Sequence, residues 1–173
     1  KTLVKDLNIM PKHVYAFEAT YNNYLELLKT IEYLNIKDIV TPINKGVWYK
    51  KEKLYMSQTE GGMSRVSNKK GCNKGNNKVE LIDLDSFFTS STIKIGFVKM
   101  DIEGSELNAL KGSQKLIQRD RPILAICIYH SAADYVRIPL YLKGMLSNYS
   151  YIIRHHWHRL SETVIYCIPN EII

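Results

Sequence analysis

The chain has 173 residues, of which 45% are hydrophobic and 24% charged, and its formal net charge at pH 7 is +7. This length and this apolar content exclude a disordered chain, and the lack of an apolar run of about 20 residues excludes a membrane-spanning helix. No charged-then-apolar leader opens the sequence. We therefore expect one cytoplasmic domain over residues 1–173.

The net charge is concentrated in one segment. Residues 45–78 contain nine Lys and Arg residues against two Glu residues, which accounts for the whole net charge of the chain. Such a segment could attract nucleic acid, a phosphorylated substrate or an anionic membrane. Its Gly, Asn, Ser and Lys content at 58–78 instead favours a solvated basic loop, which we expect to be mobile.

The three cysteines argue against a disulfide-rich protein and against a structural zinc site. Cys72, Cys127 and Cys167 are odd in number and form no CxxC pair. A disulfide framework and a structural zinc site are therefore both disfavoured, and we expect no bound metal.

The hydrophobic pattern predicts strands that alternate with helices. In chain order it predicts the tail of a helix at 2–8, a strand at 13–17, a helix at 21–34 with Thr20 as its N-cap, a strand at 39–43, an extended hairpin at 47–56, a loop at 58–78, a strand at 79–82, a short helix near 85–88, a strand at 95–100, a helix at 104–118, a strand at 123–129, a helix at 136–147, and strands at 151–154 and 163–168.

This order indicates an α/β fold with a doubly wound, mostly parallel sheet. We expect the strand at 95–100 to be central in that sheet. The last two strands are joined by a connection too short for a parallel crossover, so we expect the sheet to end in an antiparallel hairpin.

Ligands of such sheets bind beyond the carboxyl ends of the strands. Three polar positions follow predicted strands there: Glu18, Asp101 and the pair Tyr129–His130. Glu18 could accept both hydroxyls of a ribose, or could cap the next helix. We expect all three positions to meet at one edge of the sheet.

The segment after the strand at 95–100 brings three carboxylates around one turn. Gly104 permits a tight turn, and Glu106 in the first helical turn is explained as a favourable interaction with the helix dipole. Asp101 is harder to explain by packing, because we expect its side chain to point into the ligand-binding cleft beyond the carboxyl ends of the strands.

His130 follows an apolar strand, and we expect its ring to emerge at the cleft rim. A histidine there could take a proton from a hydroxyl, or could be a structural residue bonded to a carboxylate. The run at 154–158, Arg-His-His-Trp-His, could supply metal ligands together with Asp101 and His130, but its spacing matches no standard site.

The chain resembles the FkbM family of Rossmann-like, class I methyltransferases over nearly its whole length. The resemblance rests on an ordered series of blocks: VYAFE at 14–18, Asn44, GGMSR at 61–65, FVKMDIEGSE at 97–106, Tyr129-His130, Ile138-Pro139, RHH at 154–156 and ETV at 162–164. Any one block is weak, whereas the series is specific.

The resemblance implies S-adenosylmethionine as cofactor. Glu18, with Ala19 beside it, would hold the ribose, and Asn44 would approach the adenine. Asp101 would face the methionine end, while Glu103 and His130 would lie near the acceptor, which is usually a hydroxyl in this family. We interpret His130, Asp101 and Glu103 as the catalytic group.

The sequence departs from the family pattern at three places. The glycine-rich first motif and its strand have no counterpart, so we expect an N-terminally incomplete domain that binds the cofactor poorly. Ala19 stands where the family often has proline. The basic insertion at 65–78 is a further departure.

These observations predict a methyltransferase that modifies a hydroxyl of a sugar, lipid or secondary metabolite, with a small-molecule or glycan acceptor that could be anionic. A nicotinamide-dependent oxidoreductase and a non-catalytic nucleotide-binding module are the alternatives. A nucleic-acid methyltransferase is disfavoured, because the chain has no Pro-Pro-aromatic motif. The sequence does not indicate the oligomeric state.

Overall fold

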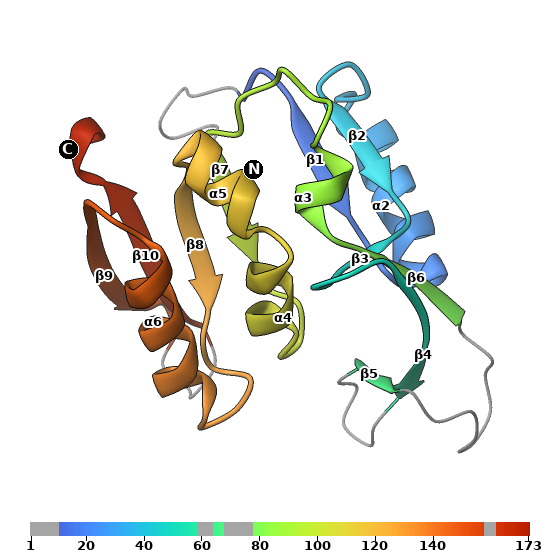
Figure 1. The fold of residues 1–173 in the computed structure, drawn as a ribbon. Helices are drawn as coiled ribbons and strands as arrows, with labels where there is room; N and C mark the ends of the chain where they lie inside the picture. Colours follow the sequence, from blue (N-terminus) through green and yellow to red (C-terminus); the bar gives the residue numbers. More distant parts are fainter. Residues whose placement is uncertain (1–10, 59–63, 68–77, 158–161) are drawn as a thin grey trace. The chain divides into compact units, whose positions relative to one another are not determined.

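The computed structural model describes residues 11–58, 64–67, 78–157 and 162–173, with only the backbone described at 56–58 and 64–67. The chain divides into two compact units, Lys1–Gly46 and Val47–Ile173, and each is described by itself. The fold is mixed α/β, as expected (Figure 1). The predicted helix tail at 2–8 lies outside the described residues. Among the described helices none is long and apolar enough to span a membrane.

The first unit is a strand–helix–strand motif. Strand β1 (Val14–Phe17) is followed by helix α2 (Tyr21–Tyr33) and by strand β2 (Val40–Ile43), which pairs with β1 in parallel. Thr20 occupies the N-cap position of α2 but makes no side-chain capping bond. The hydroxyl of Thr20 instead takes part in a hydrogen-bond network at the end of β1, which is described below.

The larger sheet of the second unit has the strand order β7-β8-β10-β9. Its strands are β7 (Phe97–Met100), β8 (Ile123–Cys127), β9 (Tyr149–His155) and β10 (Thr163–Pro169). Strands β7 and β8 are parallel, whereas β10 is antiparallel to both β8 and β9. The predicted terminal antiparallel hairpin is confirmed.

The position of β7 corrects one expectation. Within the described residues β7 lies at an end of this sheet rather than at its centre. Phe97 is 56% exposed, whereas Met100 on the other face is buried. One face of β7 therefore contributes to the core of the second unit.

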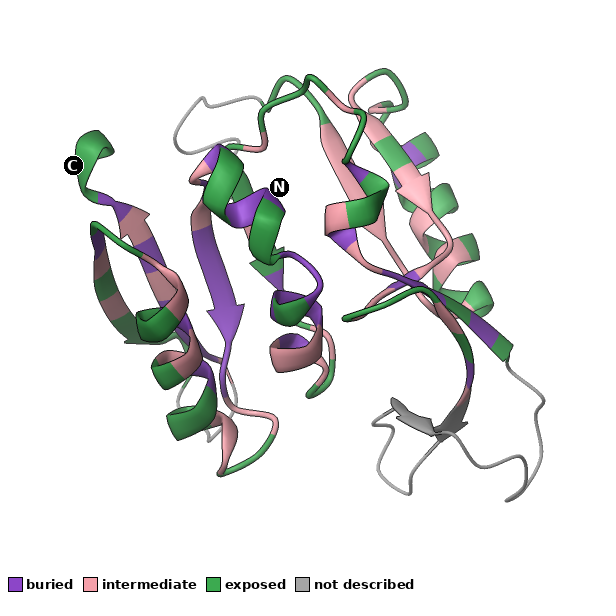
Figure 2. Cartoon of the chain, in the orientation of Figure 1, coloured by how far each residue is buried: buried purple, intermediate pink, exposed green. Residues whose placement is uncertain are grey.

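Three helices pack on one face of this larger sheet, where the buried segments, purple in Figure 2, are concentrated. They are α4 (Glu106–Lys111), α5 (Gln114–Asp120) and α6 (Asp134–Met145). Their apolar side chains form one cluster with every second residue of β8 and with residues of β10: Ala109, Leu110, Ile117, Leu124, Ile126, Ile138, Leu142, Ile165 and Cys167. The core thus fixes the carboxyl ends of β7 and β8, where the site lies.

The helix predicted at 104–118 is broken into α4 and α5. The short helix α3 (Leu84–Phe87) docks at the break. The backbone N–H of Asp85 donates to the carbonyl oxygen of Gly112, and its carboxylate accepts from the N–H groups of Lys115 and Leu116 at the start of α5. Asp85 of α3 thus caps the start of α5, so the chain forms two helices instead of one. The hydrophobic periodicity of the segment 104–118 does not indicate this contact, because Asp85 lies outside that segment.

A second sheet in this part of the chain has the strand order β3-β6-β4-β5. Its strands are β3 (Gly46–Val47), β4 (Glu52–Gln58), β5 (Ser64–Ser67) and β6 (Lys78–Ile82). Strand β5 pairs antiparallel with β4, so the expectation of an unstructured loop throughout 58–78 is wrong at Ser64–Ser67. Residues 59–63 and 68–77 lie outside the described residues.

Gly112, between α4 and α5, packs against the backbone of Trp48 and Tyr49. A Cβ at this position would overlap the carbonyl oxygen of Trp48 and would lie 2.8 Å from the Cα of Tyr49. Both obstacles are backbone atoms, which cannot move aside as a flexible side chain does. We predict that Gly112→Ala lowers the free energy of unfolding by about 1–3 kcal/mol, measured by denaturant titration.

Gly144 in α6 provides a matched control, because a Cβ there would meet nothing within 4 Å. Gly144→Ala should leave the free energy of unfolding unchanged or raise it by up to about 1 kcal/mol, through the helix propensity of alanine. Equal effects of the two substitutions would contradict the close packing at Gly112.

Candidate functional site

A small hydrogen-bond network holds the carboxyl end of β1. Oε1 of Glu18 accepts hydrogen bonds from the backbone N–H and the hydroxyl of Thr20, both at 2.8 Å. Nδ2 of Asn44 donates to the carbonyl oxygen of Glu18 at 2.9 Å and lies 3.4 Å from that of Ala19. The first unit thus brings together Glu18, Ala19 and Asn44, the residues expected to bind the nucleoside.

The two carboxylate oxygens of Glu18 differ in their partners. One carboxylate oxygen ties the residue to the start of α2, as the capping interpretation expects. Oε2 has no hydrogen-bond or ion-pair partner within the part of the chain that the structure describes. Glu18 is half-buried, so this oxygen is a fixed acceptor for a hydroxyl donor.

The carboxyl ends of β7 and β8 form a second polar edge, within the second unit. Because the two strands are parallel neighbours, Asp101 and His130 emerge side by side. Nε2 of His130 lies 3.5 Å from Oδ1 of Asp101 and 3.7 Å from Oε2 of Glu103. The structure therefore brings together Asp101, Glu103 and His130.

A sharp turn between β7 and α4 places these side chains. Glu103 and Gly104 have φ angles of 56° and 87°, both in the left-handed region. This region suits glycine but is uncommon for glutamate, and a residue held there costs about 1–3 kcal/mol. The turn directs the chain from the end of β7 into α4, and the Cα of Gly104 faces Cβ of His130.

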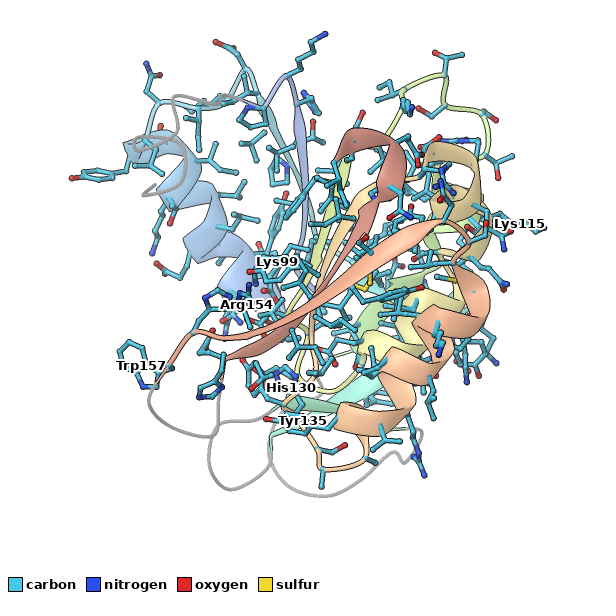
Figure 3. All side chains as sticks on the ribbon, turned by 90° about the vertical axis from the view of Figure 1, so that its left-hand side faces the viewer. Lys99, Lys115, His130, Tyr135, Arg154 and Trp157 are labelled. Carbon is cyan, nitrogen blue, oxygen red and sulfur yellow. The ribbon has the colours of Figure 1, made fainter. Side chains whose placement is uncertain are left out.

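The side chain of His130 is buried, contrary to the expectation that its ring emerges at a rim. Its side chain is 4% exposed, and Figure 3 labels its position on the ribbon. Neither ring nitrogen makes a hydrogen bond of regular geometry in the described structure. The ring is instead surrounded by carboxylates at ion-pair distances.

The sequence interpretation missed the part that Glu106 plays in this cluster. It was explained by a favourable interaction with the helix dipole in the first turn, but it is fully buried and contacts the histidine. Its Oε1 accepts a hydrogen bond of 2.8 Å from the N–H of Ile102 and lies 3.2 Å from Nδ1 of His130. A signal was present, because Ala109 and Leu110, three and four residues later on the same helix face, are apolar.

The cluster sets the protonation of His130. Burial is the largest single influence on its pKa and acts to lower it. The contact and charge of Glu106 act in the opposite direction, and so do the charges of Glu103 and Asp101. Together the carboxylates raise the pKa of His130 above its ordinary value of 6.5.

Asp101 is held ionised by its neighbours. Burial tends to raise its pKa, but the charge of Lys99 and the hydrogen bond from Tyr129 outweigh this effect and lower the pKa below 3.8. The hydroxyl of Tyr129 donates to Oδ1 at 3.0 Å, and Nζ of Lys99 lies 3.3 Å from Oδ2. Both carboxylate oxygens of Asp101 are therefore engaged.

The histidine run at 154–158 has other partners. Nδ1 of His155 is hydrogen-bonded to the hydroxyl of Thr163, and Nε2 of His156 to that of Tyr166. Trp157 is 53% exposed and points away from the ribbon in Figure 3. Position 158 lies outside the described residues.

The spacing at the second edge is compatible with a metal ion. Ligand atoms of Asp101, Glu106 and His130 lie within 4.8 Å of one another. A proton competes for the same position, because the carboxylates raise the pKa of His130.

Comparison with known proteins identifies the domain. The family model of the methyltransferase FkbM domain matches residues 9–153. The crystal structure of methyltransferase FkbM from Methylobacillus flagellatus KT is similar, with a TM-score of 0.74 and 23% identity over 95% of this chain and 39% of that one. The chain thus spans about two fifths of the length of that protein.

A second similar structure is that of a putative rRNA-methylase from Clostridium thermocellum, with a TM-score of 0.54 and 13% identity over 94% of this chain and 75% of that one. No curated protein matches the sequence. Since the family match covers most of the chain and includes both polar edges, the chain belongs to the FkbM methyltransferase domain family.

Proposed function

We propose that the protein transfers a methyl group from S-adenosylmethionine to a hydroxyl of a sugar, lipid or secondary metabolite. The observation that carries this proposal is the carboxylate–histidine cluster at the shared carboxyl edge of β7 and β8, in a chain of the FkbM family. Ligands of parallel sheets bind at such edges. A doubly wound, Rossmann-like arrangement of the complete domain is part of the proposal.

The residues at the end of β1 fit the nucleoside part of this cofactor. Oε2 of Glu18, which has no partner among the described residues, can accept hydrogen bonds from ribose hydroxyls, and the bonds of Oε1 to Thr20 hold the carboxylate in place. Asn44 and Ala19 complete the proposed nucleoside site, and Asp101 is assigned to the methionine end. When bound, the cofactor supplies a methyl group activated by a positively charged sulfur.

The second edge fits the removal of a proton. In the proposed reaction Nε2 of His130 would take the proton of the acceptor hydroxyl when its oxygen receives the methyl group. Asp101 and Glu103 stabilise the imidazolium that results, since both lie within 4 Å of Nε2. Positioning of the acceptor supplies the remainder of the rate.

The proposal extends to the acceptor and the location. The positive charge of the segment 45–78 favours an anionic small molecule or glycan. We propose a cytoplasmic location. We also propose that the substrate is not a nucleic acid, because the chain has no Pro-Pro-aromatic motif, and the likeness to the rRNA-methylase structure supports the fold alone. FkbM membership favours methyl transfer over the nicotinamide-dependent alternative.

The first prediction concerns Glu18. Glu18→Ala leaves ribose hydroxyls without a charged acceptor, at a cost of roughly 1.5–3 kcal/mol, so affinity for the cofactor should fall at least about tenfold. Titration calorimetry with S-adenosylhomocysteine on the protein measures this change. Glu26→Ala, an exposed glutamate paired with Lys29 on α2, is the control. Unchanged affinity in Glu18→Ala would place the nucleoside elsewhere.

The second prediction concerns His130. A general base contributes roughly 10²–10⁴-fold, so His130→Ala should lower turnover by that factor while affinity for S-adenosylhomocysteine changes little. Asp101→Asn should instead weaken binding, because it removes a charge assigned to the methionine end. Turnover and affinity are measured together on both variants, and near-normal turnover of His130→Ala would make the histidine purely structural.

The third prediction concerns pH. His130 acts as a base only when its ring is neutral, and its pKa in the folded protein is raised. Turnover should therefore fall as the pH drops through this raised pKa, so that the midpoint of the acid limb lies above 6.5. A midpoint at or below 6.5 in the pH profile of kcat would contradict the proposed base.

A further inference from the structure

Glu106 is a buried carboxylate to which the proposed reaction assigns no role. It is fully buried, and Oε2 has no hydrogen-bond partner in the described structure. A buried charge is costly unless it is paired, and removing its partner leaves that cost uncompensated. A carboxylate buried beside the ring of His130 therefore indicates a task that an apolar side chain could not perform.

We propose that Glu106 is a positioning residue, which fixes the ring orientation and the tautomer of His130 so that Nε2 is presented as the base. The inference rests on the proposed function, since it assigns the proton transfer to His130. It concerns a residue that touches the ring and not the acceptor.

The contacts of the three carboxylates single out Glu106. It faces Nδ1 at 3.2 Å, whereas Asp101 and Glu103 face Nε2 at 3.5 and 3.7 Å. Asp101 already accepts the Tyr129 hydroxyl and pairs with Lys99, and the side chain of Glu103 is 50% exposed. Only the carboxylate of Glu106 is both buried and directed at the nitrogen that must not act as the base.

A carboxylate beside Nδ1 favours a proton on that nitrogen. In the neutral ring, a proton on Nδ1 leaves the lone pair on Nε2, the buried nitrogen that faces Asp101 and Glu103. The same division of labour operates in catalytic triads, where a buried carboxylate holds the histidine tautomer without itself becoming protonated.

The local backbone holds both partners of the pair. The N–H of Ile102 donates to Oε1 of Glu106, so the carboxylate is fixed by the turn that precedes α4. The space that a Cβ of Gly104 would occupy lies 3.5 Å from Cβ of His130, so the turn packs against the histidine. The contact to Nδ1 is not aligned as a regular hydrogen bond, as is common for catalytic pairs before substrate binds.

The first test is independent of any acceptor. Nitrogen-15 NMR of the ligand-free protein, above the pKa of His130, reports which ring nitrogen carries the proton. We expect Nδ1–H in the wild type and a shift of population toward Nε2–H in Glu106→Gln. The ring of His156, which is bonded to Tyr166, is the internal reference and should not change.

Two NMR results would overturn the assignment. One is a wild-type ring protonated mainly on Nε2, which needs no variant to fold. The other is a larger tautomer change in Asp101→Asn than in Glu106→Gln. Because these spectra need no methyl transfer, they separate a failure of the positioning role from a failure of the proposed function.

The second test is kinetic. Glu106→Gln should lower kcat about 10- to 100-fold, leave KM for both substrates within about twofold, and move the acid limb of the kcat profile to lower pH, because the carboxylate no longer raises the pKa of His130. An unchanged acid limb would overturn the positioning role. Loss of wild-type activity on chelation, restored by a divalent cation, would also overturn it, since the cluster would then hold a metal.

Discussion

A buried negative charge is the constraint on which the second polar edge depends. Glu106 has no exposed surface, so its charge must be balanced within the fold. The partner within reach of its Oε1 is the ring of His130, three residues beyond the end of β8. The contact between Glu106 and His130 therefore helps to hold α4 against the end of β8, in addition to the apolar packing of the core.

Several local features become intelligible from this requirement. The left-handed backbone at Glu103 and Gly104 lies between the end of β7 and α4, the helix whose Glu106 contacts Nδ1 of His130. The break at Gly112 keeps α4 short, and the contacts of Asp85 fix where α5 begins. The cost of the strained turn is offset by the apolar cluster that α4, α5 and α6 form on the sheet.

The strands were largely predictable from sequence because their signals are local. Strand β8 is almost wholly apolar, and the short link after Trp157 requires an antiparallel pair. FkbM membership was predictable because the motif blocks occur in order. Local signals also located Asp101 and His130, since both follow apolar runs.

The remaining features depend on contacts between distant segments. Strand β5 is polar and is stabilised by its pairing with β4, so no alternation of apolar residues predicts it. The break between α4 and α5 depends on Asp85, which lies some thirty residues away in sequence. The raised pKa of His130 depends on Glu106, and the burial of Glu106 can be known only when the covered face of its helix is known.

The most direct test of this account is the free energy of unfolding of the wild type and of Glu106→Gln, measured between about pH 5.5 and pH 9. The folded pKa of His130 is raised, so the stability from its pairing with Glu106 is fully present below the unfolded pKa and is lost as the pH rises through the folded pKa. The account predicts that the stability of the wild type relative to the variant decreases over this range. A difference that is constant with pH, or that grows as the pH rises, would contradict a charged Glu106–His130 pair.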